Sequence, residues 1–203
     1  LNYKIYGGLP FFVRAEVKDA MGYVRLIENT SDNIAFERIV NFPTRGIGLS
    51  TIEKIRSHAI ENHTDLFQSS IAIINSLPAR AANAMQSFIH LIEEISDSTK
   101  NLMLSEKVDS ILLQSGLMAH YVNDKTDKAG TKKANLGELV TAATKYTHEE
   151  DNELNETQGF IALATLDSSG ESNKSNQGSV QLMTVHSAKG LEFPVVFLVG
   201  LEE

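Results

Sequence analysis

The stretch AEVKDAMGYVRLIE, residues 15–28, decides the fold class of this chain. Its apolar residues recur at intervals of three and four, which is the spacing of one face of an α-helix. Comparable patterns continue along most of the 203 residues, so the chain is predicted to be mainly α-helical. The expected helices are 15–28, one beginning near 31–32, one beginning near 50, and then 66–74, 79–95, 106–114, 134–146 and 157–166.

Local signals place the ends and the buried faces of several of these helices. Ser50 with Glu53 three residues later forms the pattern of a capping box, which starts a helix. Ser105 is a candidate N-cap for the helix over 106–114, and Gly116 is its candidate stop. The residues predicted to face the core are Val17, Ala20, Met21, Val24, Ile27, Phe36, Ile39, Val40, Ile52, Ile55 and Ala59.

The two ends of the chain differ from this helical body. NYKIYGG, residues 2–8, is typical of a short strand followed by a turn, and the runs VQLMTV (180–185) and PVVFLVG (194–200) are typical of buried parallel strands. The polar stretch 167–179 is predicted to be a mobile linker. A few parallel strands need helices on both faces, so we expect the helical body to be inserted into the sheet of another domain.

Composition excludes several classes of protein. The chain has no cysteine, which excludes disulfide frameworks and thiolate metal sites, and no apolar run reaches the roughly 20 residues that span a bilayer. A net charge of −8 argues against nucleic-acid binding over the whole surface but leaves room for a local site. We expect a cytoplasmic protein without a membrane partner, and, because the chain begins with Leu1, a piece of a longer one.

The turn PTRGIGLSTIE, residues 43–53, is the first candidate for chemistry. Gly46 and Gly48 flank Ile47 and lead into the helix start, where backbone N–H groups favour an anion. Arg45 could add a charge-assisted hydrogen bond to a phosphate oxygen. Such a turn could grip one phosphate of duplex DNA without reading bases, or it could be a plain corner between two helices.

Two further loops carry polar or charged residues. DKTDKAGTKK, residues 124–133, could be a second phosphate-binding loop or an ordinary exposed one. In HSAKGLEFP, residues 186–194, His186 and Lys189 could contact phosphates or sugars, Gly190 allows close approach, and Glu192 could accept a hydrogen bond from a ribose hydroxyl. The remaining histidines show no metal-ligand spacing, so no metal site is expected.

The sequence also lacks the parts of a complete nucleotide-hydrolysing site. It contains no G-x-x-x-x-G-K-[ST] loop and no Asp-Glu pair after an apolar strand. Those parts hold the phosphates and Mg²⁺ in P-loop enzymes. We therefore expect the chain alone to be inactive in ATP hydrolysis and to have no catalytic residue.

Four stretches resemble UvrD/PcrA-type superfamily 1 DNA helicases. They are YKIYGGLPFFVRAEVKDAMGYVRLI (3–27), AFERIVNFPTRGIGLSTIEKI (35–55), ANLGELVTAAT (134–144) and VQLMTVHSAKGLEFPVVFLVGLEE (180–203), and the last is similar to helicase motif V. The resemblance implies a helical insertion, the 2B subdomain, with strands of the RecA-like 2A domain at its ends. The implied limits are 1–8 for the first 2A strand and hinge, 9–177 for 2B, and 178–203 for the returning 2A strands.

The same resemblance implies roles for particular residues. The turn and helix start would bind duplex DNA, the motif V-like loop would couple the ATP state to single-stranded DNA, and Gly7 and Gly8 would form the hinge of the insertion. Arg14, Glu16 and Lys18 would be structural or coupling residues beside that hinge. The implied DNA-binding residues are Thr44, Arg45, Gly46, Ile47, Gly48, Ser50, Thr51, His186, Ser187 and Lys189, and the implied nucleotide-binding residues are Gly190 and Glu192.

The function that this resemblance implies is that of a fragment of an ATP-dependent 3′–5′ DNA helicase of DNA repair and replication. ATP and Mg²⁺ would serve the parent protein, and neither is expected to bind this fragment alone. The expected partners are duplex and single-stranded DNA, the remaining motor domains and accessory repair proteins, and the terminal strands could also pair two copies. The alternative, favoured by the net charge and the acidic run 148–156, is a protein-interaction or autoregulatory module.

Overall fold

The computed structural model describes residues 3–6, 11–123, 129–148, 153–168 and 180–200, and within them it is mainly helical, as predicted. The α-helices are α1 (Ala15–Glu28), α2 (Asn33–Ile39), α3 (Leu49–Asn62), α4 (Leu66–Ala72), α5 (Ala79–Thr99), α6 (Leu104–Gln114), α7 (Leu117–Val122), α8 (Ala129–Lys145) and α9 (Glu156–Ser168). Two 3₁₀ turns, η1 (Phe11–Val13) and η2 (Ile74–Ser76), and two strands, β1 (Tyr3–Tyr6) and β2 (Val180–Met183), complete the described elements.

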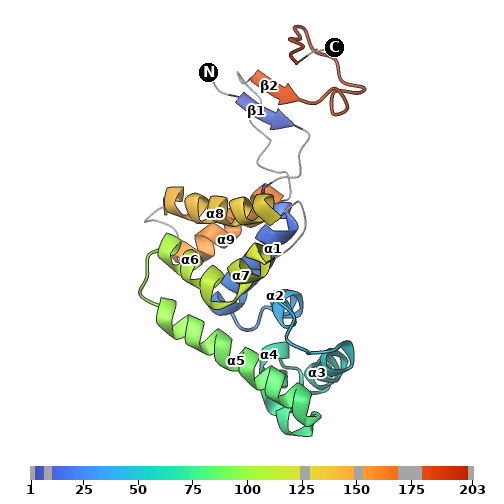
Figure 1. The fold of residues 1–203 in the computed structure, drawn as a ribbon, viewed down its shortest axis with the longest axis vertical. Coiled ribbons are helices and arrows are strands. Elements are labelled where there is room, and N and C mark those ends of the chain that lie inside the picture. Colours follow the sequence, from blue (N-terminus) through green and yellow to red (C-terminus); the bar gives the residue numbers. More distant parts are fainter. Residues whose placement is uncertain (1–2, 7–10, 124–128, 149–152, 169–179, 201–203) are drawn as a thin grey trace.

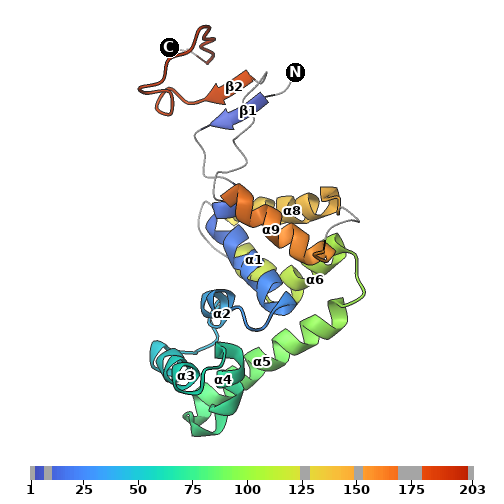
Figure 2. The same ribbon diagram turned by 180° about the vertical axis from the view of Figure 1, so that it is seen from behind.

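The helices form two groups that the long helix α5 joins. Figure 1 shows α1, α6, α7, α8 and α9 packed together in the middle of the molecule, and α3 and α4 beside the far end of α5. Helix α2 lies between the two groups and packs against α1. The view from behind shows the same order, with the two strands beyond α8 and α9 (Figure 2). The strands and α3 therefore lie at opposite ends of the molecule.

Helix α1 is the centre of the core. Its side chains Val17, Tyr23, Val24 and Leu26 are fully buried, because α2, α5, α6, α8 and α9 all contact this helix. Every residue predicted to face the core is buried in the structure. The helical period in the sequence was therefore sufficient to identify the inward faces.

Several helix bounds differ from the prediction. Helix α8 begins at Ala129 and not at 134, α7 was not among the expected helices, and the capping of α3 and α6 is different. Helix α3 begins directly after Gly48, whose carbonyl oxygen accepts hydrogen bonds from the N–H groups of Thr51 and Ile52. Ser50 is thus inside the first turn, and the predicted Ser50–Glu53 capping box is wrong. Helix α6 has Met103 as its N-cap in place of Ser105.

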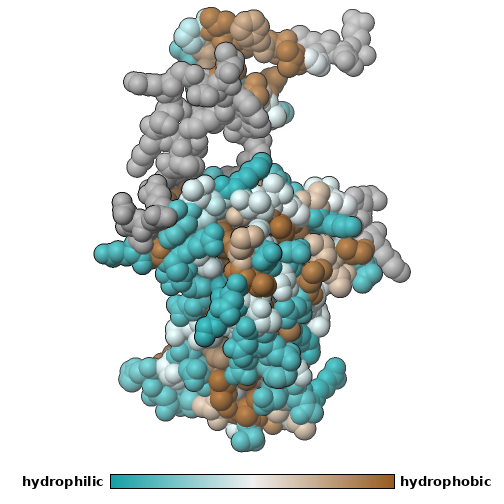
Figure 3. All heavy atoms as spheres, turned by 90° about the vertical axis from the view of Figure 1, so that its left-hand side faces the viewer, coloured by the Kyte–Doolittle hydropathy of each residue, from teal (hydrophilic) through white to brown (hydrophobic). Residues whose placement is uncertain are grey.

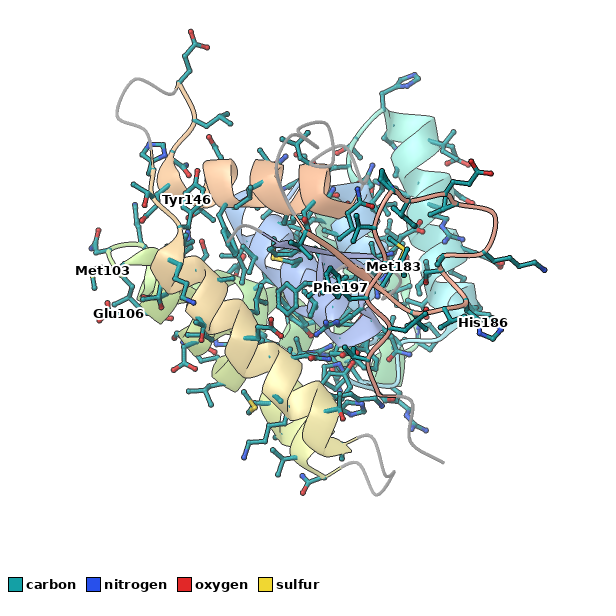
Figure 4. All side chains as sticks on the ribbon, turned by 90° about the horizontal axis from the view of Figure 1, so that it is seen from above. Met103, Glu106, Tyr146, Met183, His186 and Phe197 are labelled. Carbon is teal, nitrogen blue, oxygen red and sulfur yellow. The ribbon has the colours of Figure 1, made fainter. Side chains whose placement is uncertain are left out.

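The start of α6 keeps one half of a capping box. The Glu106 side chain accepts a hydrogen bond from the Met103 backbone N–H over 3.4 Å, and Figure 4 labels both residues at this end of the helix. The predicted stop is confirmed, because Gly116 follows the helix with a φ of 80°. A left-handed residue of this kind ends a helix and is most easily a glycine.

The strands at the two ends of the chain pair with each other. β1 and β2 run parallel, with Tyr3 opposite Val180 and Tyr6 opposite Met183. The strand expected within 194–200 is not formed, and Val195–Val199 are 60–88% exposed. A strand needs a neighbour for its backbone groups, and β1 and β2 are the strands in the described part of the chain. Figure 3 shows apolar surface gathered at this end of the molecule, whereas hydrophilic residues cover most of the helical body.

The described helices do not meet the requirements for crossing a membrane. None of them combines the length and the apolar content that a bilayer-spanning helix needs.

Candidate nucleic-acid interface

The predicted DNA-binding turn is a closed loop between α2 and α3. Asn41, the second residue after α2, accepts hydrogen bonds through Oδ1 from the backbone N–H groups of Arg45 (2.9 Å) and Ile47 (3.1 Å). One side chain therefore fixes the path of the loop from inside, as Asn commonly does in turns. Sequence reasoning missed Asn41, although an Asn that opens a Pro- and Gly-containing loop is a recognisable signal.

The Gly46-Ile47-Gly48 segment packs into the core through the Ile47 side chain and leaves the two glycines exposed. Ile47 is 1% exposed and belongs to the core, whereas Gly46 and Gly48 on either side are exposed. The Ile47 side chain is therefore an anchor in the core, and a contact of this residue with DNA would not be made by its side chain. The surface that remains for a ligand is the backbone of the two glycines.

The backbone conformation requires glycine at position 46 but not at position 48. Gly46 has a φ of 83°, a left-handed conformation that other residues adopt only with strain. Gly48 has an ordinary extended backbone with a φ of −84°, and a Cβ placed on it would have no neighbour within 4 Å. The fold thus requires the glycine at 46 and does not require the one at 48.

Arg45 does not point outward. Its two terminal nitrogens donate to the carbonyl oxygens of Ile39 (3.1 Å), Pro43 (3.1 Å) and Ser115 (3.2 Å), and to the Tyr23 hydroxyl. The half-buried guanidinium is therefore held against the body of the molecule, and the contact of this side chain with a phosphate stays a prediction that these hydrogen bonds do not favour. Four acceptors already use the N–H groups that a phosphate would need.

Tyr23 completes this support from α1. Its hydroxyl donates to the carbonyl oxygen of Phe42 over 2.6 Å and accepts from Arg45. Burial raises the pKa of Tyr23 to about 12, and the nearby Arg45 charge opposes this shift only in part. The hydroxyl therefore stays protonated and keeps its hydrogen bond to the loop.

The start of α3 supplies the remaining part of the site. Thr51 and Ile52 donate to Gly48, so the N–H groups that the helix itself leaves unpaired are those of Leu49 and Ser50. Ser50 is exposed beside them, whereas Thr51 is 6% exposed, and its hydroxyl is not available to a large ligand. Thr44 is exposed on the other side of the turn.

Charges around α3 are partly neutralised. Arg56 makes a two-point ion pair with Glu37 of α2, with 2.8 Å between Nη2 and Oε2, and this contact lowers the pKa of Glu37. Lys54 is exposed on the same helix. The site therefore offers backbone donors and a helix start with few cations. Such a site favours a single phosphate group over a long charged track.

The second predicted group lies on the loop after β2. Ser187 donates its backbone N–H to the Thr184 hydroxyl (3.2 Å), and the two hydroxyls are 2.9 Å apart. His186 and Lys189 are exposed, and Figure 4 shows His186 pointing away from the body. Gly190 turns the chain with a φ of 83°.

The two predicted groups do not form one site. The loop after β2 lies at the strand end of the molecule, and α3 lies at the other (Figure 1). The exposed Glu192 follows on the same loop. Any ligand of 186–192 is thus separate from a ligand of the turn at 44–51.

The residues beside the predicted hinge form a polar network in the core. Gly7 and Gly8 themselves lie outside the described residues. Arg14 donates to Asn135 of α8 (2.6 Å), and Asn135 in turn donates to the buried Glu16. These contacts tie α1 to α8, whereas Lys18 is exposed. A structural role for Arg14 and Glu16 is consistent with this arrangement.

Asp19 extends the network from α1 to two further elements. It accepts a hydrogen bond from Tyr121 of α7 and forms an ion pair with Arg38 of α2, each over 2.8 Å. Burial and this carboxylate raise the pKa of Tyr121. Sequence reasoning identified none of these partners, because they lie far away in the chain.

Two other predicted features were compared with the structure. Lys125 and Lys128 lie outside the described residues, and Lys132 of α8 lies over the Tyr121 ring, 5.4 Å from its centre. Across the ranges that the structure describes, no three His, Asp or Glu side chains gather as metal ligands.

Known proteins resemble this chain over its whole length. It matches the UvrD-like helicase C-terminal domain family over residues 1–203. It is 44% identical over 206 residues to DNA helicase II of Escherichia coli (strain K12) and 38% identical over 208 residues to the ATP-dependent DNA helicase PcrA of Bacillus subtilis (strain 168). These matches cover 100% of this chain, but 29% and 28% of those proteins, so the chain spans less than a third of their length.

Proposed function

Because the chain belongs to the UvrD-like helicase C-terminal domain family, we propose that it is the duplex-binding part of an ATP-dependent DNA helicase. In this proposal residues 9–177 form the 2B insertion, and 1–8 and 178–203 belong to the RecA-like 2A domain. The turn at 44–50 holds one phosphate of the duplex. The proposal covers binding and regulation of unwinding in DNA repair or replication, and it assigns no catalytic residue to this chain.

The presence of an exposed glycine at position 48 is the main support for the proposal. The structure gives this residue an ordinary backbone and open space, so a side chain would be tolerated by the fold. Ser, Asn or Asp would serve slightly better than glycine at an N-cap, by a few tenths of a kcal/mol. A glycine at an exposed helix start is thus best explained by a ligand that approaches the backbone closely.

The donors of the site fit a phosphate oxygen. The unpaired N–H groups of Leu49 and Ser50 lie at the positive end of the α3 dipole. The Ser50 hydroxyl lies in the same turn and is exposed. These groups carry no base-specific pattern, so we expect binding to duplex DNA of any sequence.

The loop 186–192 has a separate role in the proposal. His186, Ser187 and Lys189 would contact single-stranded DNA, and Gly190 and Glu192 would lie beside the nucleotide of the parent protein. Hydrolysis of ATP by the parent protein would supply the free energy for unwinding, and Mg²⁺ would neutralise charge on the phosphates. The exposed donors here suit a sugar or phosphate, whereas the described residues offer no cluster that would hold Mg²⁺.

Titration of a fluorescent duplex with this chain, followed by anisotropy over a range of salt concentrations, tests the proposal. Gly48→Val is expected to weaken binding by roughly thirtyfold, the loss of about 2 kcal/mol from charge-assisted hydrogen bonds. Gly137→Val is the matched control, because Gly137 also has open space at Cβ but lies on α8. If both variants bind like the wild type, the turn is not the duplex site.

The alternative function is a protein-interaction module. The acidic run that favours it is only partly described, since residues 149–152 lie outside the structure. A chain that binds no duplex at low salt, in either the wild type or Gly137→Val, would favour this alternative.

A further inference from the structure

Arg45 joins segments that are far apart in the sequence. Its guanidinium bonds Ile39 at the end of α2, Pro43 in the turn, Tyr23 of α1 and Ser115 between α6 and α7. Three of the four acceptors are backbone carbonyl or hydroxyl groups outside its own turn. One side chain therefore connects the turn to the end of α2 and to the helix group around α1.

Aromatic rings fix the plane of this guanidinium. It lies 5.7 Å from the centre of the Tyr23 ring and 5.4 Å from that of Phe88 on α5, and both rings are fully buried. Cation–π contacts of this kind are strong where water is excluded. A planar guanidinium can lie beside both rings and donate to all four acceptors at once, whereas a lysine ammonium cannot.

The backbone of the turn depends on this arrangement. Arg45 directly precedes Gly46, and its own N–H bonds Asn41 together with that of Ile47. Displacement of the Arg45 side chain would release the turn from α1, α5 and Ser115. Backbone donors lose their hydrogen bonds when they move by about 1 Å, because hydrogen-bond distances are narrowly defined.

We propose that Arg45 is a positioning residue, which sets the phosphate-binding turn from behind without touching DNA. The predicted effect of Arg45 on DNA binding rests on the proposed function, whereas its predicted effect on the position of the turn does not. It replaces the usual reading of an arginine in a DNA-binding loop, namely a direct ion pair with phosphate. The two roles predict different behaviour for the same substitutions.

Arg45→Lys distinguishes a positioning role from a direct phosphate contact, because lysine keeps the positive charge but lacks the planar guanidinium. A positioning role predicts that Arg45→Lys and Arg45→Met each weaken duplex binding about tenfold, since a phosphate hydrogen bond is lost in both. The slope of log Kd against log salt concentration stays as in the wild type. A direct contact predicts near wild-type binding for Arg45→Lys and a slope reduced by about 0.9 for Arg45→Met.

Amide hydrogen exchange without DNA provides the second readout. Positioning predicts that the Arg45 and Ile47 amides exchange at least about tenfold faster in Arg45→Lys, while amides of α8 are unchanged. Tyr23→Phe keeps the ring and removes one acceptor, so it is expected to show a smaller change in the same amides. This milder variant also serves if Arg45→Lys does not fold.

The outcomes distinguish the two proposals. Unchanged exchange at residues 45 and 47 in both folded variants would overturn the positioning role, whatever the DNA result. Faster exchange with a reduced salt slope in Arg45→Met would overturn it too, because it would reveal a direct phosphate contact. Absence of duplex binding by the wild type would refute the proposed function, and the exchange result would still decide how Arg45 acts.

Discussion

Tyr23→Phe tests the internal support of the turn at two pH values. The Tyr23 hydroxyl donates to Phe42 and accepts from Arg45 in a site that excludes solvent. Removal of two hydrogen bonds of ordinary net strength is expected to lower the free energy of unfolding by about 2 kcal/mol at pH 8. Phenylalanine keeps the ring, so the loss reports the hydroxyl rather than a cavity.

The difference between wild type and variant is expected to shrink at high pH. The pKa of Tyr23 is raised from 10.0 to about 12 in the folded chain. The unfolded chain thus releases this proton first, and the stability tied to it is complete below pH 10 and is lost as the pH rises toward 12. At pH 11 the wild type loses about 1.4 kcal/mol from this group, and the Phe variant loses nothing there.

Chemical denaturation followed by far-ultraviolet circular dichroism measures both values. The wild type should exceed Tyr23→Phe by about 2 kcal/mol at pH 8 and by well under 1 kcal/mol at pH 11. Tyr121→Phe offers a comparison, because the pKa of Tyr121 is also raised but its hydroxyl bonds Asp19. A Tyr23→Phe difference that is equal at the two pH values would refute the view that this hydroxyl is buried and protonated.

Three other substitutions test the packing. Gly22→Ala should lower the free energy of unfolding by about 1–3 kcal/mol, because the new Cβ would lie 2.7 Å from Ile39 Cγ2, and thermal unfolding would reveal it. Asn41→Ala should cost about 1–3 kcal/mol by leaving two turn amides unpaired, and should speed their hydrogen exchange. Phe197→Ser should change the free energy of unfolding by less than about 0.5 kcal/mol, since this ring is 87% exposed; a larger loss would mean that the ring is packed in solution.

The separation of the two candidate groups has a consequence for function. The turn at 44–50 leads into α3, which lies at the opposite end of the molecule from the loop at 186–192. In the proposed helicase, one end would hold duplex DNA while the other would face the motor. The polar network of Glu16, Asn135 and Asp19 would keep the intervening helices together as one body.

The sequence alone determined most of the helices, though not α7, and it determined the inward faces of α1, α2 and α3. The apolar period places Val24 and Ile55 inside because a helix buries residues three and four apart, whatever its neighbours are. It also identified the Gly46–Gly48 turn, since glycines before a helix are a local signal. These features depend on residues close together in the chain, so a local pattern suffices.

Only the tertiary structure decided which side chains of the turn face outward. Arg45 and Ile47 belong to the motif in sequence, yet Arg45 turns toward Tyr23, Phe88 and Ser115, which contact its guanidinium, and Ile47 is buried in the core. The strand expected at 194–200 failed for a related reason, since pairing depends on a neighbour and not on composition. Direction and pairing are set by distant partners, which a local pattern does not contain.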